Sequence, residues 1–151
     1  MLAGMFDQAR MLGYPREALQ LAITGRHGLA RGYSPACAAR LLALQARAHA
    51  ALGEIKQAAH AVVESEHAFE HVDAGAEPEW ARFIDDAYLS GEYAKTFGDL
   101  GRPVESTRFT RHSIATARTQ RRARSEAFSQ TALAHAALAR KDLETAVRAA
   151  H

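Results

Sequence analysis

The chain has little of several residue types that commonly define a protein class. Its one cysteine, Cys37, excludes an internal disulfide. Aromatic residues make up only 7% of the 151 residues, and no window reaches the run of roughly 20 apolar residues that a membrane-spanning helix needs. The N-terminal stretch lacks the basic start and the apolar run of a signal peptide. We therefore expect a cytoplasmic protein with no membrane segment.

Good helix formers, alanine above all, fill most of the chain, and hydrophobic residues reach 48%. These residues lose little side-chain freedom in a helix, so the composition predicts an all-α fold. The net charge of +2 hides an asymmetry. Residues 64–99 hold ten acidic residues and two basic ones, whereas residues 102–124 hold seven arginines and one glutamate. Charge is therefore segregated along the chain.

A short phrase recurs. Leucine followed by Gly-x-x-x-Glu/Gln-Ala/Ser occurs at Gly13, Gly53 and Gly101, and a degenerate copy starts at Lys141; the starts are 40, 48 and 40 residues apart. Such a period predicts a repeat protein, because each unit stacks on its neighbours to bury its apolar face. We expect one domain of four repeats, at about 1–30, 36–72, 78–119 and 121–151, with both ends cut short as in a fragment of a longer protein.

Breaks between apolar-periodic segments give the expected helices. Gly and Pro mark most of these breaks, including 31–35 and 73–78. About seven helices are expected, over 1–12, 15–30, 36–52, 54–71, 79–100, 103–119 and 121–140, with a further one starting at 142. Among these, 79–100 is expected to be the longest.

The recurring phrase is similar to the turn and second-helix start of tetratricopeptide (TPR) repeats. Small residues also stand where helices of that family cross closely, namely Ala46, Ala94 and Ala134, then Ala18, Ala58, Ser106 and Ala146, then Gly25, Ser65 and Ser113. The repeats are longer than is usual for the family, and the expected aromatic near the end of the first helix occurs only as Phe97. The resemblance implies antiparallel helical hairpins stacked in a right-handed α-solenoid.

The third repeat, with Trp80, Phe83 and Tyr88, resembles more narrowly the repeat region of actinobacterial helix-turn-helix transcriptional regulators. This implies a non-catalytic module that binds a protein or an effector, as the sensing or dimerisation region of a bacterial transcriptional regulator. A constitutive protein–protein interaction scaffold and a zinc metallohydrolase are the alternatives. No Ser/His/Asp or Cys/His arrangement and no phosphate-binding glycine loop is evident, so we predict that the chain is not an enzyme.

The TPR resemblance also implies a ligand groove along the first helix of each repeat, lined here by Arg40, Ala43, Arg47, Tyr88, Lys95, Phe128, Thr131 and His135. Such a basic groove suits an acidic peptide, a C-terminal carboxylate or an anionic small effector, because arginine binds carboxylates in bidentate fashion. The alternatives are a solvated face without a ligand and a face covered by a partner chain. A homodimer is one such arrangement.

The stretch His67-Ala-Phe-Glu70-His71 matches the H-x-x-E-H pattern of one class of zinc peptidases. Eight histidines make chance pairs common, and a histidine near a helix C-terminus is also explained by the helix dipole. We therefore predict no metal and no cofactor, with His67 and His71 as the pair to test for zinc.

The arginines between Arg118 and Arg124 are a candidate nucleic-acid patch. No aromatics or glycine loop interleave with them, and they follow an acidic repeat whose charge they complement. We predict no direct contact with nucleic acid.

Overall fold

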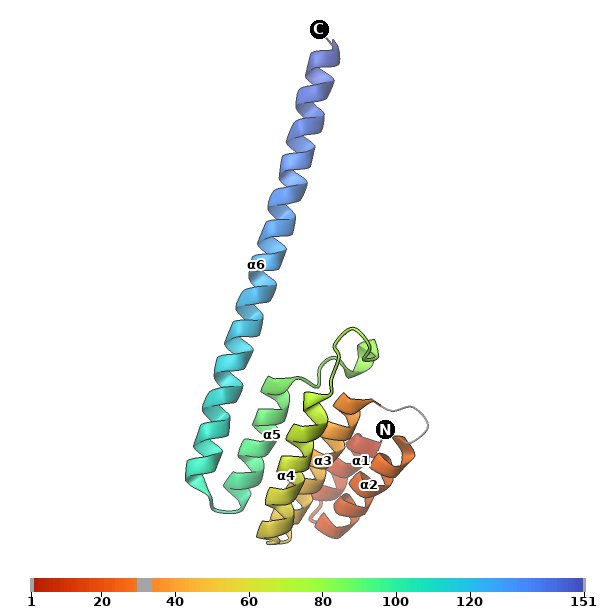
Figure 1. The fold of residues 1–151 in the computed structure, drawn as a ribbon, viewed down its shortest axis with the longest axis vertical. Helices are drawn as coiled ribbons and strands as arrows, with labels where there is room; N and C mark the ends of the chain where they lie inside the picture. Colours follow the sequence, from red (N-terminus) through yellow and green to blue (C-terminus); the bar gives the residue numbers. More distant parts are fainter. Residues whose placement is uncertain (1, 30–33, 151) are drawn as a thin grey trace. The chain divides into compact units, whose positions relative to one another are not determined.

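The computed structural model describes residues 2–29 and 34–150. The described part is all-α without a strand, as predicted (Figure 1). Its elements are α1 (Leu2–Met11), α2 (Pro15–Gly28), α3 (Pro35–Ala51), α4 (Ile55–Glu70), the 3₁₀ helix η2 (Glu79–Ala81), α5 (Asp86–Asp99) and α6 (Pro103–Ala150). None of these helices is apolar enough over a sufficient length to cross a membrane.

The chain divides into two compact units, Met1–Ile114 and Ala115–His151. The first unit holds α1 to α5 and the first turns of α6, and the second holds the rest of α6. The predicted end of the second helix at about Ala30, and most of the break that follows it, lie outside the described residues.

The three glycines of the recurring phrase form the same turn. Gly13, Gly53 and Gly101 have φ of 82°, 73° and 68°, a left-handed conformation that glycine adopts without steric cost. In each case the N–H of the following residue donates to the carbonyl four residues before the glycine: Tyr14 to Ala9 (2.9 Å), Glu54 to His49 (2.9 Å) and Arg102 to Phe97 (2.8 Å). The sequence repeat is therefore also a repeat of helix-ending geometry.

These turns produce helical hairpins that pack side by side as a helical bundle. α1 packs on α2, and α3 packs on α2, α4 and α5 (Figure 1). Because helix axes approach closely where side chains are small, the core is rich in alanine. Its two clusters centre on Ala36, Ala39, Ala43, Ala46, Ala61, Val62, Leu89 and Tyr93, and on Phe6, Ala18, Ala22, Leu44 and Ala48.

Small residues stand at the helix crossings of the first unit, as the repeat alignment predicts. Ser65 Oγ donates to the carbonyl of Ala39, and Ser113 Oγ donates to that of Ala87, both at 2.6 Å. Both partners of the second bond lie 48 residues after those of the first. Gly25, the equivalent residue of the first hairpin, is buried. Of the second unit's candidates, Ala134 is exposed and the side chain of Ala146 lies outside the described part.

The loop after α4 is fastened to the start of α3. Ser34 caps α3 by accepting a hydrogen bond from Cys37 N at 3.2 Å. Its hydroxyl also donates to Glu77 Oε2 at 2.5 Å, while Glu77 Oε1 accepts from the N–H of Ala36 at 3.1 Å. One buried glutamate therefore holds the connection between the second and third hairpins.

The expectation of one long helix over 79–100 is wrong. Residues 79–81 form η2, and α5 begins only after Asp85. Asp85 has extended backbone (φ −118°, ψ 177°), and its Oδ1 accepts from the N–H of Tyr88 at 2.8 Å. An aspartate that caps a helix in this way stops the helix from extending backward, because its side chain occupies the donors of the first turn.

The expected breaks near residues 120 and 141 are also absent, since α6 runs without interruption from Pro103 to Ala150 and is the longest helix. In the fourth copy of the phrase Arg140-Lys141 replaces Leu-Gly, so the residue that turned the chain three times is missing. The fourth repeat accordingly forms no hairpin within the described residues, which hold six α-helices where about seven were expected.

Candidate functional site

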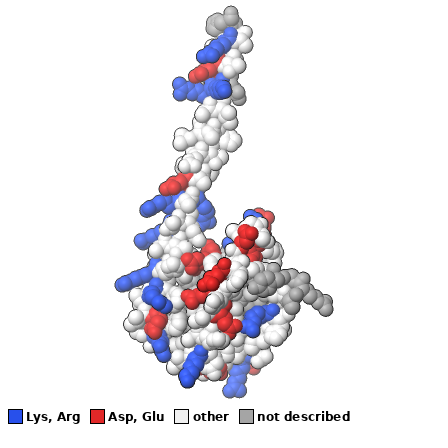
Figure 2. Space-filling model, viewed as in Figure 1, with Lys and Arg blue, Asp and Glu red and all other residues white. Residues whose placement is uncertain are grey.

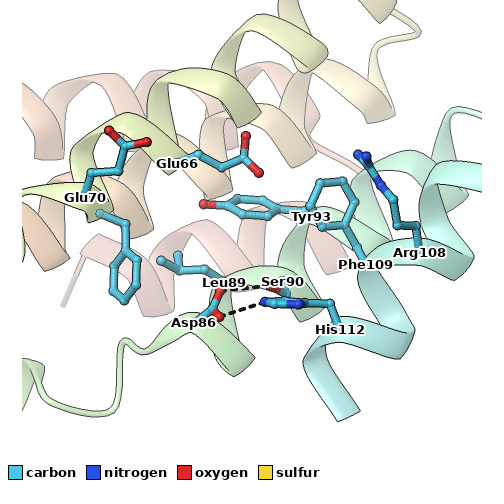
Figure 3. A pocket seen from close by; sticks show the side chains of 10 residues that line it. Glu66, Glu70, Asp86, Leu89, Ser90, Tyr93, Arg108, Phe109 and His112 are labelled. Carbon is cyan, nitrogen blue, oxygen red and sulfur yellow. Dashed lines mark hydrogen bonds and ion pairs between the residues drawn. The ribbon is translucent and has the colours of Figure 1, made fainter. Parts of the chain in front are cut away.

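A cleft of about 510 Å³ opens between α4, α5 and the first turns of α6, all within the first unit (Figure 3). Its walls combine apolar and charged groups. They comprise Phe69, Leu89, Tyr93 and Phe109, the acidic residues Glu66, Glu70 and Asp86, and Ser90, Arg108 and His112.

The aromatic side of the cleft is packed and rigid. Tyr93 meets Phe109 edge to face with ring centroids 5.4 Å apart, and Phe109 stacks on Phe97 at 5.7 Å. The Tyr93 hydroxyl lies 2.7 Å from Ser65 Oγ. Burial raises the pKa of Tyr93 well above its usual value, so the phenol stays neutral at physiological pH.

The rim of the cleft joins two helices through charge. His112 Nε2 lies 2.7 Å from Asp86 Oδ2, and Ser90 Oγ donates to Asp86 Oδ1 at 3.3 Å (Figure 3). The Arg108 guanidinium lies 4.8 Å from the centroid of the Phe109 ring. Asp86 on α5 is therefore held by α6, and the shape of the cleft depends on that contact.

Glu66 has the most perturbed carboxyl of the rim. Partial desolvation raises its pKa, and the nearby Glu70 and Asp86 raise it further, whereas Arg108 and His67 lower it. The shift means that Glu66 gains from a cation placed beside it. Figure 2 shows acidic side chains grouped on the face of the first unit that is turned to the viewer.

The predicted groove residues of the first unit do lie together on α3 and α5. Arg40 Nε donates to the Tyr88 hydroxyl at 3.0 Å, and its guanidinium lies 5.1 Å from the Phe83 centroid and 5.8 Å from that of Tyr88. Phe83 and Tyr88 meet edge to face at 5.5 Å. Arg40 is thus engaged in an aromatic cluster that fastens α5 and the turn before it to α3.

Arg47 and Lys95 share one carboxylate. Arg47 Nη1 donates to Glu92 Oε2 at 3.2 Å, and Lys95 Nζ donates to Glu92 Oε1 at 3.1 Å. The side chains of Arg47 and Glu92 are each only 8% exposed. Sequence reasoning missed Glu92, although shifting by the 48-residue period places it at the position of the buried Leu44.

Arg47 and Lys95 also line a hollow of about 430 Å³ between α5 and α6 of the first unit. Arg47 Nε is buried and has no hydrogen-bond acceptor among the described residues. The other three predicted groove residues, Phe128, Thr131 and His135, belong to the second unit and are exposed there.

The candidate zinc pair lies at the end of α4. His67 Nδ1 is 3.6 Å from Glu70 Oε2, and His71 Nδ1 lies 2.9 Å from the carbonyl oxygen of His67, so that nitrogen is occupied as a donor. In the part of the chain that the structure describes, no three His, Cys, Asp or Glu side chains are grouped so as to hold a metal ion. The geometry lends no support to a zinc site.

The cleft itself escaped sequence reasoning. Its acidic and basic sides come from the two oppositely charged stretches, 64–99 and 102–124, whose contrast the sequence does display. What was missing was the pairing of helices that turns this contrast into one site.

Comparison of the chain with protein-family models, with curated proteins and with solved structures finds no match. Its function is therefore inferred from its own geometry.

Proposed function

We propose that the chain is a non-catalytic, TPR-like helical-repeat module, with hairpins stacked in the manner of a right-handed α-solenoid. The support is the left-handed glycine turn that occurs three times with one hydrogen-bond pattern, together with the paired Ser–carbonyl contacts 48 residues apart. Repeat modules of this kind bind ligands on grooved surfaces.

The cleft between α4, α5 and α6 is the ligand site in this proposal, and its composition is the observation that carries it. A volume of about 510 Å³ suits one or two side chains, the aromatic wall suits an apolar body, and three carboxylates suit a cation. The ligand class is accordingly a peptide that presents an arginine or lysine beside an apolar residue.

As its setting we propose the sensing region of a bacterial transcriptional regulator, with a constitutive scaffold as the alternative. A ligand in the cleft would bear on both α5 and α6, because Asp86 and His112 line it and contact each other. A regulator requires that ligand binding alter the contacts of α6, whereas a scaffold does not. Amide hydrogen exchange of residues 103–114, with and without ligand, separates the two.

The ligand class is tested by titrating the ¹⁵N-labelled chain with two blocked tripeptides, acetyl-Leu-Arg-Leu-amide and acetyl-Leu-Glu-Leu-amide. We expect the arginine peptide to shift amide signals of α4, α5 and residues 103–114. The double variant Glu66→Gln/Asp86→Asn should weaken binding about tenfold or more, since two charge-assisted contacts are lost. The control Glu79→Gln removes an exposed charge outside the cleft and should leave binding unchanged. Equal binding of both peptides would refute the cationic ligand class.

One observation favours a second candidate site. The unpaired, buried Arg47 Nε and the exposed Lys95 line the hollow of about 430 Å³, which keeps an anionic ligand as a proposal for the predicted groove. In the same titration the glutamate peptide would then shift signals around Gly91 and Lys95. Lys95→Ala should abolish those shifts and leave the arginine peptide's binding intact.

A further inference from the structure

The second unit carries an apolar helix face that is exposed to solvent. Residues 121–141 are all exposed, and the thirteen residues from 127 to 139 include no Asp, Glu, Lys or Arg. Figure 2 shows this uncharged stretch as a white segment of α6 between two groups of charged side chains. Large apolar side chains stand free here, with Phe128 at 77% exposure and Leu143 at 66%.

The apolar residues fall on one face. Their stripe consists of Phe128, Ala132, Ala136, Ala139, Leu143 and Val147, at spacings of four, four, three, four and four residues. At 100° per residue these positions lie within about a third of the helix circumference. A helix that packs on nothing has only its intrinsic propensity to sustain it, so such a stripe is typical of a helix that pairs.

We propose that the stripe pairs with the same stripe of a second copy of this chain, antiparallel. Sliding two antiparallel copies past each other shows that one register places Phe128 opposite Ala139 of the other copy and Ala132 opposite Ala136. Large side chains then face small ones, which lets the helices approach closely and fill the space between them. The contact is two-fold symmetric, so each pairing occurs twice.

The charges beside the stripe agree with the same register. Arg122, Glu126, Arg140 and Glu144 all lie on one flank of the stripe. In the antiparallel register Arg122 of one copy is level with Glu144 of the other, and Glu126 is level with Arg140. Two-fold symmetry makes four ion pairs between copies. Flanking charges of this kind select the partner and the orientation of paired helices.

A parallel pair has the opposite balance. It places each of these residues beside its own counterpart, and it brings the arginines of both 118–124 segments together. Like charges side by side disfavour that arrangement. Charge complementarity thus singles out an antiparallel second copy, and this inference does not rest on the cleft or on its ligand.

Sedimentation equilibrium of the full chain tests the pairing. We expect a dimer whose Kd rises about tenfold in Glu126→Arg and in Arg140→Glu, because two symmetric ion pairs become repulsive. The double variant Glu126→Arg/Arg140→Glu should recover most of the affinity, since the pairs re-form with reversed sign. Gln130→Arg, which adds the same charge on the opposite face, is the matched control and should dimerise like the parent. A chain that stays monomeric at 100 μM or more, or charge variants with unchanged Kd, would overturn the proposal.

Orientation is tested separately. In a Cys37→Ala chain, a spin label attached at Arg148→Cys lies away from the stripe. Antiparallel pairing separates the two labels by about 40 Å along the helix axis, whereas a parallel pair sets them level with each other. A short distance between the labels would overturn the antiparallel arrangement even if the chain dimerises.

Discussion

The two units of the chain use the same kinds of residue with different results. In the first unit α3 lies among three other helices and buries most of its residues, whereas in the second unit α6 exposes residues 121–141 throughout. Both stretches are rich in alanine and both carry a copy of the repeated phrase. The local difference is a single glycine, which turns the chain at Gly53 and is replaced by Lys141 in the last copy. Helix propensity alone does not decide whether a repeat folds back on itself.

The largest effect is expected where the first unit buries charge. Arg47→Leu leaves the Glu92 carboxylate with only the partly exposed Lys95, and we expect the free energy of unfolding to fall by about 3 kcal/mol. The double variant Arg47→Leu/Glu92→Leu removes both charges and restores the leucine that the first-unit repeat has at Leu44. It should recover most of that loss. Urea denaturation of each variant measures the difference, and a double variant no more stable than the single one would contradict the explanation.

The next effect concerns the glycine turn. Gly53→Ala forces a side chain into left-handed backbone (φ 73°) and should cost about 1–2 kcal/mol, although no atom lies within 4 Å of the added Cβ. Gly28→Ala is the matched control, because its Cβ also meets no atom within 4 Å and its φ is not positive. That substitution should be neutral or stabilising by up to about 1 kcal/mol. Equal effects of the two on thermal unfolding would show that the turn conformation is not what matters.

The converse experiment supplies the second unit with the missing turn. Arg140→Leu/Lys141→Gly writes Leu-Gly into the fourth copy of the phrase, and glycine in a helix interior costs about 1 kcal/mol relative to alanine. We expect faster amide exchange around residue 141 and less helix by circular dichroism. Arg140→Leu/Lys141→Ala is the control and should keep α6 continuous. A helix that remained unbroken with the glycine would mean that tertiary packing, rather than the turn residue, ends α3.

The smallest effect is on pH dependence at the cleft. The raised pKa of Glu66 means that the folded chain holds this proton more tightly than the unfolded chain does, so its stabilising effect is present at low pH and is lost as pH rises through that pKa. A bound cation favours the ionised carboxylate. The arginine peptide should therefore bind up to about fivefold more weakly once pH falls below the pKa of Glu66. Calorimetric titration at several pH values measures this, and Glu66→Gln should flatten the profile in that range.

The sequence predicted the features that local chemistry decides. Leu-Gly pairs located all three turns, because a left-handed residue at a helix end requires glycine more than any other residue. The break at Asp85 was not predicted, since an aspartate within an apolar-periodic stretch reads equally as a helix residue or as a cap. The continuity of α6 was missed because a repeat pattern was extended over a copy that lacks its turn residue.

The cleft required knowledge of pairing that no local pattern contains. Asp86 and His112 stand 26 residues apart, and only the packing of α6 on α5 brings them to 2.7 Å. Glu92 illustrates the same gap, because a glutamate three residues before a lysine looks like an exposed helix pair, yet its side chain is 8% exposed and contacts Arg47 on another helix. The groove residues Arg40, Arg47, Tyr88 and Lys95 were placed correctly side by side, while their role as a binding surface stays a prediction.

The equivalence of the hairpins has a consequence for how this chain can grow. Residues 53–100 begin with the glycine of one turn and end with the leucine before the next, so inserting a second copy of that stretch after Leu100 leaves a Leu-Gly junction at both ends. The inserted piece would bring its own serine, Ser65, and its own acceptor position, Ala87, for the helix crossings on either side. Lengthening by one 48-residue period therefore needs no new kind of contact, and a cooperative, more helical chain by circular dichroism would be its signature. Tandem duplication is available to this protein as a single mutational step.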